Sequence, residues 1–369
     1  MPIGALYIHF PFCVKKCIYC DFTSFARQPF YEYIDALKKE FLLKQPLFDD
    51  LKFNSIFFGG GTPSLIPVDW LDDILSFLKS TSLISNNAEI TIEANPESLD
   101  AEKIIAYQKM GINRLSIGVQ SFDDEVLKKT GRIHDQQSGI DAIINAFQLG
   151  LENINIDLIA GLPGETRKTW EINKEIVSQM PLKHISTYML EVARGTKLYR
   201  KISNNSIQVT DEPPLQEYFS DWIAFLNQCG WNHYEISNFA KKNYKCLHNL
   251  HYWKGSEYLG LGLNAVSRLK NIRHRNNARM NNYLIKLSQK LLPIAWSEKL
   301  SPSTIINEHI MLGLRLLNDG IDLHLLDQKK NKIIFQWISK GKLIIKNKRL
   351  LLSKEGVFCS NEIIASLMV

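Results

Sequence analysis

Six short runs of β-forming residues alternate with amphipathic helical patterns in the first half of the chain, and this alternation restricts the fold more than any other feature. It predicts parallel strands joined by right-handed helical crossovers. Because a complete barrel of this kind needs eight units, six units predict an α/β fold with a partial (β/α)6 barrel. The β-like runs are Ala5–Phe10, Ser55–Phe58, Glu89–Glu93, Arg114–Gln120, Ile154–Ile159 and His184–Leu190, and the helical patterns are Tyr31–Leu43, Trp70–Leu78, Ala101–Met110, Ser138–Leu149 and Thr169–Ser178.

The alternation stops after about residue 200. A helical pattern at Leu215–Cys229 is followed by a polar and aromatic stretch, and an amphipathic helix is expected at Thr304–Leu317. Two apolar runs in Leu343–Leu352, around Asn347, predict a hairpin, and Asn361–Met368 predicts a last short helix. We therefore expect a barrel over residues 1–200, an extension over 201–295 and a small α+β module over 296–369.

The composition is that of an ordinary globular protein. The chain has 369 residues, of which 45% are hydrophobic and 22% charged. It contains no apolar run of transmembrane length, and its N-terminus lacks the basic start of a signal peptide. Cysteines grouped as if for metal indicate a reducing compartment, so we expect a cytoplasmic protein. The net charge of +6 permits an acidic partner surface without requiring nucleic acid.

Three of the six cysteines, Cys13, Cys17 and Cys20, lie within eight residues. A structural zinc site needs four ligands, whereas three thiolates suit a 4Fe–4S cluster with one iron free of protein ligands. Lys15 and Lys16 beside them favour the thiolate form. Residue chemistry thus favours iron–sulfur, and it leaves open buried thiols or a zinc site completed by a distant residue. The distant candidates are Cys229, Cys246, His248 and Cys359.

The sequence from Tyr7 through Cys20 to Phe22 resembles the radical S-adenosylmethionine (SAM) superfamily, in the branch of the anaerobic coproporphyrinogen oxidases and their HemW-type relatives. The resemblance implies a TIM-like partial barrel, SAM at the open iron, and a winged-helix-like C-terminal module.

Glycine-rich and polar motifs follow successive strands, at the end where barrel proteins bind ligands. Gly59–Pro63 resembles the GGGTP motif of the superfamily, and its glycines allow a close approach to the backbone. In the coproporphyrinogen oxidases that the chain resembles, the matching residues contact two SAM molecules. The resemblance assigns Tyr7, Tyr19, Gly60, Gly61 and Glu93 to a first molecule, and Gly61, Thr62, Gln120, Arg132 and Asp157 to a second, if one binds.

Two differences separate the chain from the oxidases. Phe22 stands where they carry a fourth cysteine, and the sequence begins only a few residues before the first strand. The stretch His248–Trp253 also matches the HNxxYW motif of HemW-type proteins. Imidazole is a common ligand of heme iron, and tyrosine and tryptophan supply flat apolar surface. The resemblance makes His248, Asn249, Tyr252 and Trp253 heme candidates; on residue chemistry alone, a buried structural cluster explains them as well.

The resemblance implies a heme chaperone that binds heme, retains a 4Fe–4S cluster with SAM, and delivers heme to acceptor hemoproteins, respiratory ones in particular. No catalytic residue is assigned. The alternative is an oxygen-independent coproporphyrinogen III oxidase that uses SAM radical chemistry. Acceptors at the inner membrane make peripheral membrane contact an expectation, and a homodimer is compatible with the family.

Two runs of basic residues each allow more than one interpretation of their role. The first run forms either a solvated face or a surface for porphyrin propionates or anionic lipid heads. It consists of Arg268, Lys270, Arg273, His274, Arg275 and Arg279. The C-terminal module carries a second run between Lys329 and Arg349. The aromatic interleaving of a DNA reader is missing there, so we expect no nucleic acid.

Overall fold

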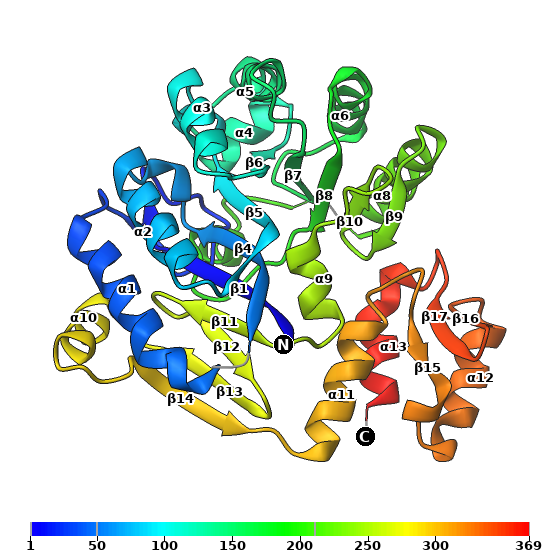
Figure 1. Cartoon of the computed structure of the whole chain (residues 1–369). Helices are drawn as coiled ribbons and strands as arrows, with labels where there is room; N and C mark the ends of the chain where they lie inside the picture. Colours follow the sequence, from blue (N-terminus) through cyan, green and yellow to red (C-terminus); the bar gives the residue numbers. More distant parts are fainter. Residues whose placement is uncertain (1, 49–50, 210–211, 369) are drawn as a thin grey trace.

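The computed structural model describes residues 2–48, 51–209 and 212–368, and within these residues twelve strands form one curved sheet (Figure 1). The strand order is β14-β13-β12-β11-β1-β4-β5-β6-β7-β8-β10-β9. Because β14 and β9 are the two edges and do not pair with each other, the sheet is an open barrel.

The centre of the sheet is parallel, and its strands follow in chain order. All six β-like runs of the sequence are strands here, so the partial (β/α)6 barrel is confirmed, although β4 and β5 are longer than expected. The six strands are β1 (Ile3–Phe10), β4 (Lys52–Gly60), β5 (Ile84–Ala94), β6 (Arg114–Gln120), β7 (Ile154–Ala160) and β8 (His184–Met189).

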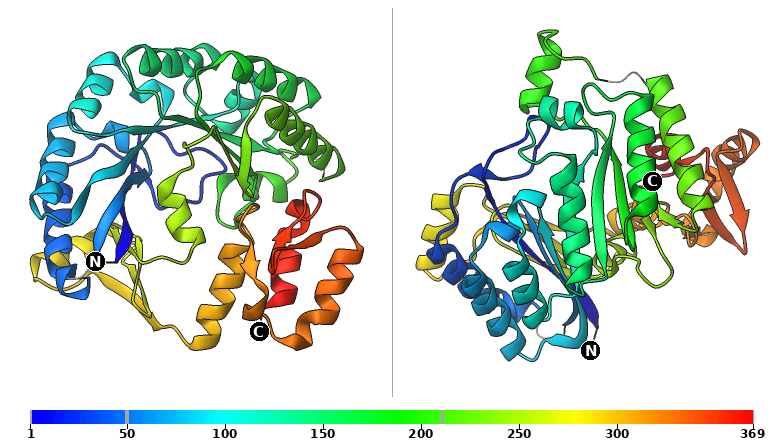
Figure 2. Two further views of the ribbon diagram at one scale, coloured as in Figure 1. Left: turned by 45° about the vertical axis from the view of Figure 1, so that its right-hand side comes forward. Right: turned by 90° about the horizontal axis from the view of Figure 1, so that it is seen from above.

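Helices cover the outer face of the sheet, as Figure 2 shows. The five expected helices are present, with ends shifted by a few residues. Two of them begin where a side chain satisfies a free backbone N–H group: Asp100 accepts from Lys103 N, and Asp135 accepts from Ser138 N. The helices are α1 (Tyr31–Lys44), α2 (Val68–Ser80), α3 (Ala101–Lys109), α5 (Gln136–Gln148) and α6 (Arg167–Gln179).

The sequence pattern missed the short helix α4 (Asp124–Thr130). Asp123 caps its start by accepting from Glu125 N, and Gly131 ends it in the left-handed region, with φ of 82°. Seven residues are too few for a clear apolar period. This helix matters because it delivers Arg132 to the open end of the barrel.

The segment after residue 200 extends both edges of the sheet. On one side β11 (Tyr258–Leu261) pairs in parallel with β1 and continues into the antiparallel strands β12 (Val266–Leu269), β13 (Ile272–Asn276) and β14 (Ile294–Lys299). On the other side β10 (Asn238–Ala240) pairs with β8, and β9 (Asn232–Glu235) pairs with β10. The remaining helices of this segment are α7 (Lys197–Ser203), α8 (Glu212–Gln228), α9 (Leu247–Trp253) and α10 (Met280–Ser288).

A buried ion pair ties this extension to α1. Lys44 Nζ lies 2.6 Å from Glu40 Oε1, and both side chains are fully buried. Glu40 Oε2 accepts from Tyr283 Oη at 2.7 Å and from Gly262 N at 2.8 Å, and Lys44 donates to Asn276 Oδ1 at 3.1 Å. The pair therefore links α1, β13 and α10.

The C-terminal part has its own apolar core, built around Ile310, Leu350 and Leu367. The expected hairpin is present, and its turn uses Asn347 and Lys348 with φ of 52° and 62°. Arg268 and Arg273 of the first basic run pair with Glu308 of this part, so they are not free for a ligand. Its elements are α11 (Pro302–Gly313), β15 (Ile321–Asp322), α12 (Asn331–Ser339), β16 (Leu343–Lys346), β17 (Arg349–Leu352) and α13 (Ser360–Leu367).

None of the helices in the described residues combines the length and the apolar character that crossing a membrane requires.

Candidate functional site

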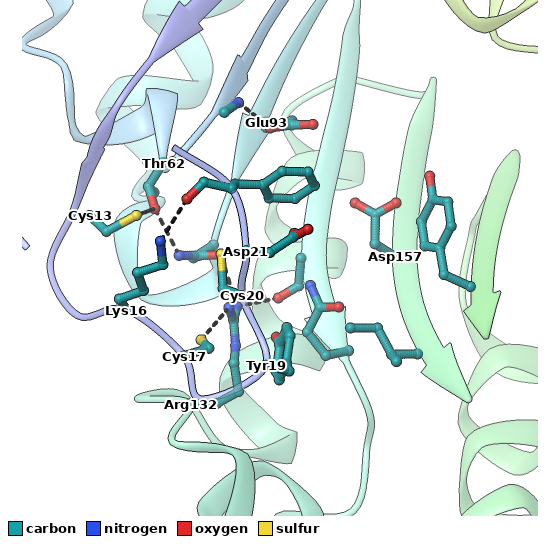
Figure 3. A pocket seen from close by; sticks show the side chains of 18 of the residues that line it. Cys13, Lys16, Cys17, Tyr19, Cys20, Asp21, Thr62, Glu93, Arg132 and Asp157 are labelled. Atoms are coloured by element: carbon teal, nitrogen blue, oxygen red, sulfur yellow. Dashed lines mark hydrogen bonds between the residues drawn. The ribbon is translucent and has the colours of Figure 1, made fainter. Parts of the chain in front are cut away.

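The cysteine loop lies over the carboxyl end of the barrel. It leaves β1, passes through β2 (Phe12–Cys13) and returns at β3 (Phe25–Ala26). Ile18 anchors it on both sides: its N–H donates to Thr130 O at 3.2 Å, and its carbonyl accepts from Leu198 N at 2.8 Å. Cys13, Cys17 and Cys20 all line one cavity of about 310 Å³, here called the cysteine cavity (Figure 3).

Two neighbouring side chains donate to the thiols. Thr62 Oγ1 lies 3.7 Å from Cys13 Sγ, and Arg132 Nη1 lies 3.6 Å from Cys17 Sγ. Burial raises the pKa of the Cys13 and Cys20 thiols, and this effect exceeds the opposing attraction of Lys16. Lys16 therefore favours the thiolate form of these two residues, as expected, but does not outweigh their burial. A bound metal centre would favour the deprotonated form, because thiolate rather than thiol is the metal ligand.

The glycine turn after β4 is shaped by the cysteine loop itself. Gly61 N donates to Phe10 O and Thr62 N to Phe12 O, both at 2.7 Å. A Cβ on Gly61 would lie 2.5 Å from Phe12 O and 3.0 Å from Cys13 Sγ. Gly60 has φ of +115°, which side chains rarely adopt. The glycines therefore let the loop and its first cysteine approach the barrel closely.

Two half-buried carboxyl groups, those of Glu93 and Asp157, line the cysteine cavity. Glu93 Oε2 accepts from Gly60 N at 3.0 Å, and Asp157 accepts from Ser116 Oγ and Asn155 Nδ2, each at 3.0 Å. Burial, and then the nearby Asp157, raise the pKa of Glu93 to about 8, and burial also raises the pKa of Asp157. An acid pair held like this favours a ligand that brings positive charge.

Arg132 lies between the cysteine loop and the strand ends. Its Nη2 donates to Asn95 Oδ1 at 2.8 Å and to Gly118 O, and its Nε is buried without a partner. Asn95 was not among the sequence candidates, although it lies two residues after Glu93, directly beyond the end of β5. Arg132 thus connects the cysteine loop, through Cys17, to Asn95 and to the backbone of β6.

Most of the sequence candidates meet in this cavity. Those that line it are Tyr19, Gly60, Gly61, Thr62, Glu93, Gln120, Arg132 and Asp157. Tyr7 is not among the described residues that line it, and its hydroxyl lies 3.0 Å from His9 Nδ1. Residues that also line the cavity but that the motifs did not mark include Asn95, Ser116 and Met189.

The HNxxYW motif lies elsewhere. It forms α9, which lies inside the curve of the sheet (Figure 1). Glu89 caps this helix by accepting from Leu247 N and His248 N, each at 3.1 Å. His248 is 1% exposed, with Nδ1 at 3.1 Å from Ser55 Oγ and Nε2 at 3.0 Å from Tyr252 Oη. Both ring nitrogens are therefore occupied, and burial lowers the pKa of His248 to about 3.

The Cys246 thiol accompanies α9 rather than the cysteine loop. It is fully buried 3.7 Å from Glu89 Oε1, and burial raises its pKa to about 12. Cys229 is exposed, and Cys359 lies on the C-terminal part. The zinc alternative needs a further ligand from Cys229, Cys246, His248 or Cys359. None of these four is among the described residues that line the cysteine cavity.

Comparisons with known proteins identify both the fold of the chain and its family. The family model of the radical SAM superfamily matches residues 7–176. The chain is similar throughout to the solved structure of coproporphyrinogen III oxidase (HemN) from Escherichia coli, with a TM-score of 0.85 and 21% identity, covering 100% of this chain and 90% of the other. At that identity the likeness shows the fold alone.

Curated relatives show the family. The heme chaperone HemW of Buchnera aphidicola subsp. Acyrthosiphon pisum is 37% identical over 77% of this chain and 76% of its own length. HemW of Bacillus subtilis is 33% identical over 84% of this chain and 82% of its own length. HemW of Mycobacterium tuberculosis is 29% identical over 100% of this chain and 95% of its own. The chain therefore belongs to the HemW heme chaperone family of the radical SAM superfamily.

Proposed function

We propose that this chain binds heme and transfers it to acceptor hemoproteins. The observation that carries the proposal is its family: the relatives named as heme chaperones match it over three quarters or more of its length. The oxidase alternative is not favoured, because the likeness to HemN rests on 21% identity and Phe22 stands at the position of the fourth cysteine.

Within this proposal Cys13, Cys17 and Cys20 hold a 4Fe–4S cluster. When bound, such a cluster supplies one electron at a time and an open iron for SAM. The cysteine cavity supports the assignment, because its thiols, glycine turn and acidic side chains lie around one space. Glu93 would hold a positively charged group of the first SAM molecule. A second SAM molecule at Gln120, Arg132 and Asp157 remains a prediction.

We also propose that the HNxxYW residues contact heme, with His248 as the candidate ligand of its iron. Because His248 donates or accepts through both ring nitrogens, the contact requires its hydrogen bonds to Ser55 and Tyr252 to break and α9 to shift. His248→Ala is expected to move the Soret band and lower heme affinity, and His324→Ala, on the exposed surface, is the control. A parent-like spectrum for His248→Ala would remove this histidine from the proposal.

The partners follow from the proposed transfer. We propose respiratory hemoproteins as acceptors, a cytoplasmic chain and a peripheral contact at the inner membrane, where such acceptors lie. The proposal includes no nucleic-acid partner. A homodimer also remains a prediction, which light scattering after size-exclusion chromatography tests directly.

The cluster assignment is tested by metal analysis after anaerobic reconstitution. Replacing the three loop cysteines by alanine should remove iron, sulfide and the visible absorption of the cluster. The matched control replaces Cys229 and Cys359, which do not line the cysteine cavity, and should keep all three signals. Iron content that is unchanged by the triple replacement contradicts the assignment.

The function itself is tested with the reconstituted parent protein. We expect tight heme binding and transfer to an apo-hemoprotein, followed as the appearance of the acceptor's own spectrum. In parallel, coproporphyrinogen III with SAM and a reductant should remain unconverted. Formation of protoporphyrinogen IX under those conditions would replace the chaperone by the enzyme.

A further inference from the structure

A second cavity of about 420 Å³ adjoins the cysteine cavity and shares Lys16, Cys17, Cys20 and Asp21 with it. Its other wall comes from the connection after β8 and from α7. This wall carries Arg194, Lys197 and Arg200, all exposed. We call this space the basic cavity.

The charge of the basic cavity is not neutralised by the protein. Four cationic side chains line it, those of Lys16, Arg194, Lys197 and Arg200, against the single carboxylate of Asp21. Among the described residues, none of the salt bridges involves Arg194, Lys197 or Arg200. A cavity with surplus positive charge attracts anions, and guanidinium groups bind carboxylates through paired hydrogen bonds.

The wall is also held in place. Leu198 of α7 is buried, and its N–H donates to Ile18 O of the cysteine loop at 2.8 Å. Thr196 caps α7 by accepting from Tyr199 N at 3.1 Å. The cations therefore keep a fixed place beside the cysteines rather than on a free loop.

Exposed apolar side chains line the adjoining cysteine cavity. Phe22 is 65% exposed and Met189 is 46% exposed, and both line the cysteine cavity. Large apolar side chains exposed at the rim of a cavity commonly mark a binding surface. A ligand that satisfies both features has a flat apolar body and carboxylates at one edge.

Heme has this form, with a planar macrocycle and two propionates on one side. Resting on the proposed function, we infer that heme first docks at the mouth of the cysteine cavity: its propionates bind Arg194, Lys197 and Arg200, and its macrocycle packs on Phe22 and Met189. This site is open to solvent, whereas His248 is buried inside the sheet, so docking here precedes any contact with α9.

The test compares charge reversals at two places. Arg194→Glu with Arg200→Glu should raise the Kd for heme at least tenfold in cluster-loaded protein. The control pair Lys332→Glu and Lys346→Glu makes the same change of net charge on the C-terminal part, at two exposed side chains. It should bind heme within twofold of the parent. Cluster absorption and SAM binding of both variants verify that the barrel is intact.

A second ligand tests the contribution of the two heme carboxylates separately. Heme dimethyl ester lacks the two charges, so the parent and the Arg194/Arg200 variant should bind it within twofold of each other. Phe22→Ser should weaken heme and the ester alike, by threefold or more. Tight heme binding by the Arg194/Arg200 variant, or an equal loss of heme and ester, would overturn the docking site. A parent protein that binds no heme would instead overturn the proposed function.

Discussion

The raised pKa of Glu93 makes SAM binding depend on pH in a direction that can be worked out. A carboxyl group with a pKa of about 8 is about 1% ionised at pH 6 and about 9% ionised at pH 7. Below pH 7 the α-amino group of the ligand stays largely protonated. If the ionised Glu93 holds that group, affinity rises about ninefold over this interval, or about 1.3 kcal/mol.

The same linkage predicts proton release. Binding of a cation lowers the pKa of Glu93, so at pH 7 a side chain that is mostly protonated in the free protein loses about 0.9 of a proton. Calorimetry of cluster-loaded, unreduced protein in two buffers of different ionisation enthalpy measures this number. Asp157 lies close by and its pKa is also raised, so any release from it adds in the same direction.

Two variants separate Glu93 from its surroundings. Glu93→Gln keeps the shape of the side chain, and should lower affinity and flatten its pH dependence between pH 6 and 7. Glu191→Gln removes an exposed carboxylate from the lining of the same cavity and should keep the ninefold rise. An affinity that does not change with pH in the parent, or Glu93→Gln binding like the parent, would refute the reasoning.

Three further predictions concern the supports of the site. Gly61→Ala should at least halve the iron bound per chain, because its Cβ would clash with Phe12 O; Gly139→Ala, whose Cβ meets only ordinary contacts at 3.5 Å, should not. Lys44→Met should lower the free energy of unfolding, measured in urea, by about 3–5 kcal/mol, because it leaves Glu40 buried and unpaired. The control Lys174→Ala, which removes one partner of a surface ion pair, should lower it by about 0.5 kcal/mol. Glu89→Gln should weaken the cap of α9 and speed hydrogen exchange of its amides about tenfold, or about 1.4 kcal/mol; unchanged exchange would contradict that role.

The sequence by itself determined the barrel and the position of its site. The period of apolar residues and the turn glycines are local signals, and they located β6 to the residue and the other five parallel strands within a few residues. Cys13, Cys17 and Cys20 are close in sequence, so their shared loop needed no long-range information. The ends of parallel strands meet at one edge of a sheet, which explains why Glu93 and Asp157 were expected together.

Tertiary structure decided what depends on distant partners. The parallel pairing of β11 with β1 joins residues about 250 positions apart, and no local period announces it. His248 is buried because Ser55 and Glu89, far away in sequence, receive its ring and its backbone. The ionisation of Cys13 and Glu93 likewise follows from burial, which only the folded chain creates. The spacing of residues in the sequence identifies the residues of a site, but the free energy of ionising them depends on their surroundings in the folded chain.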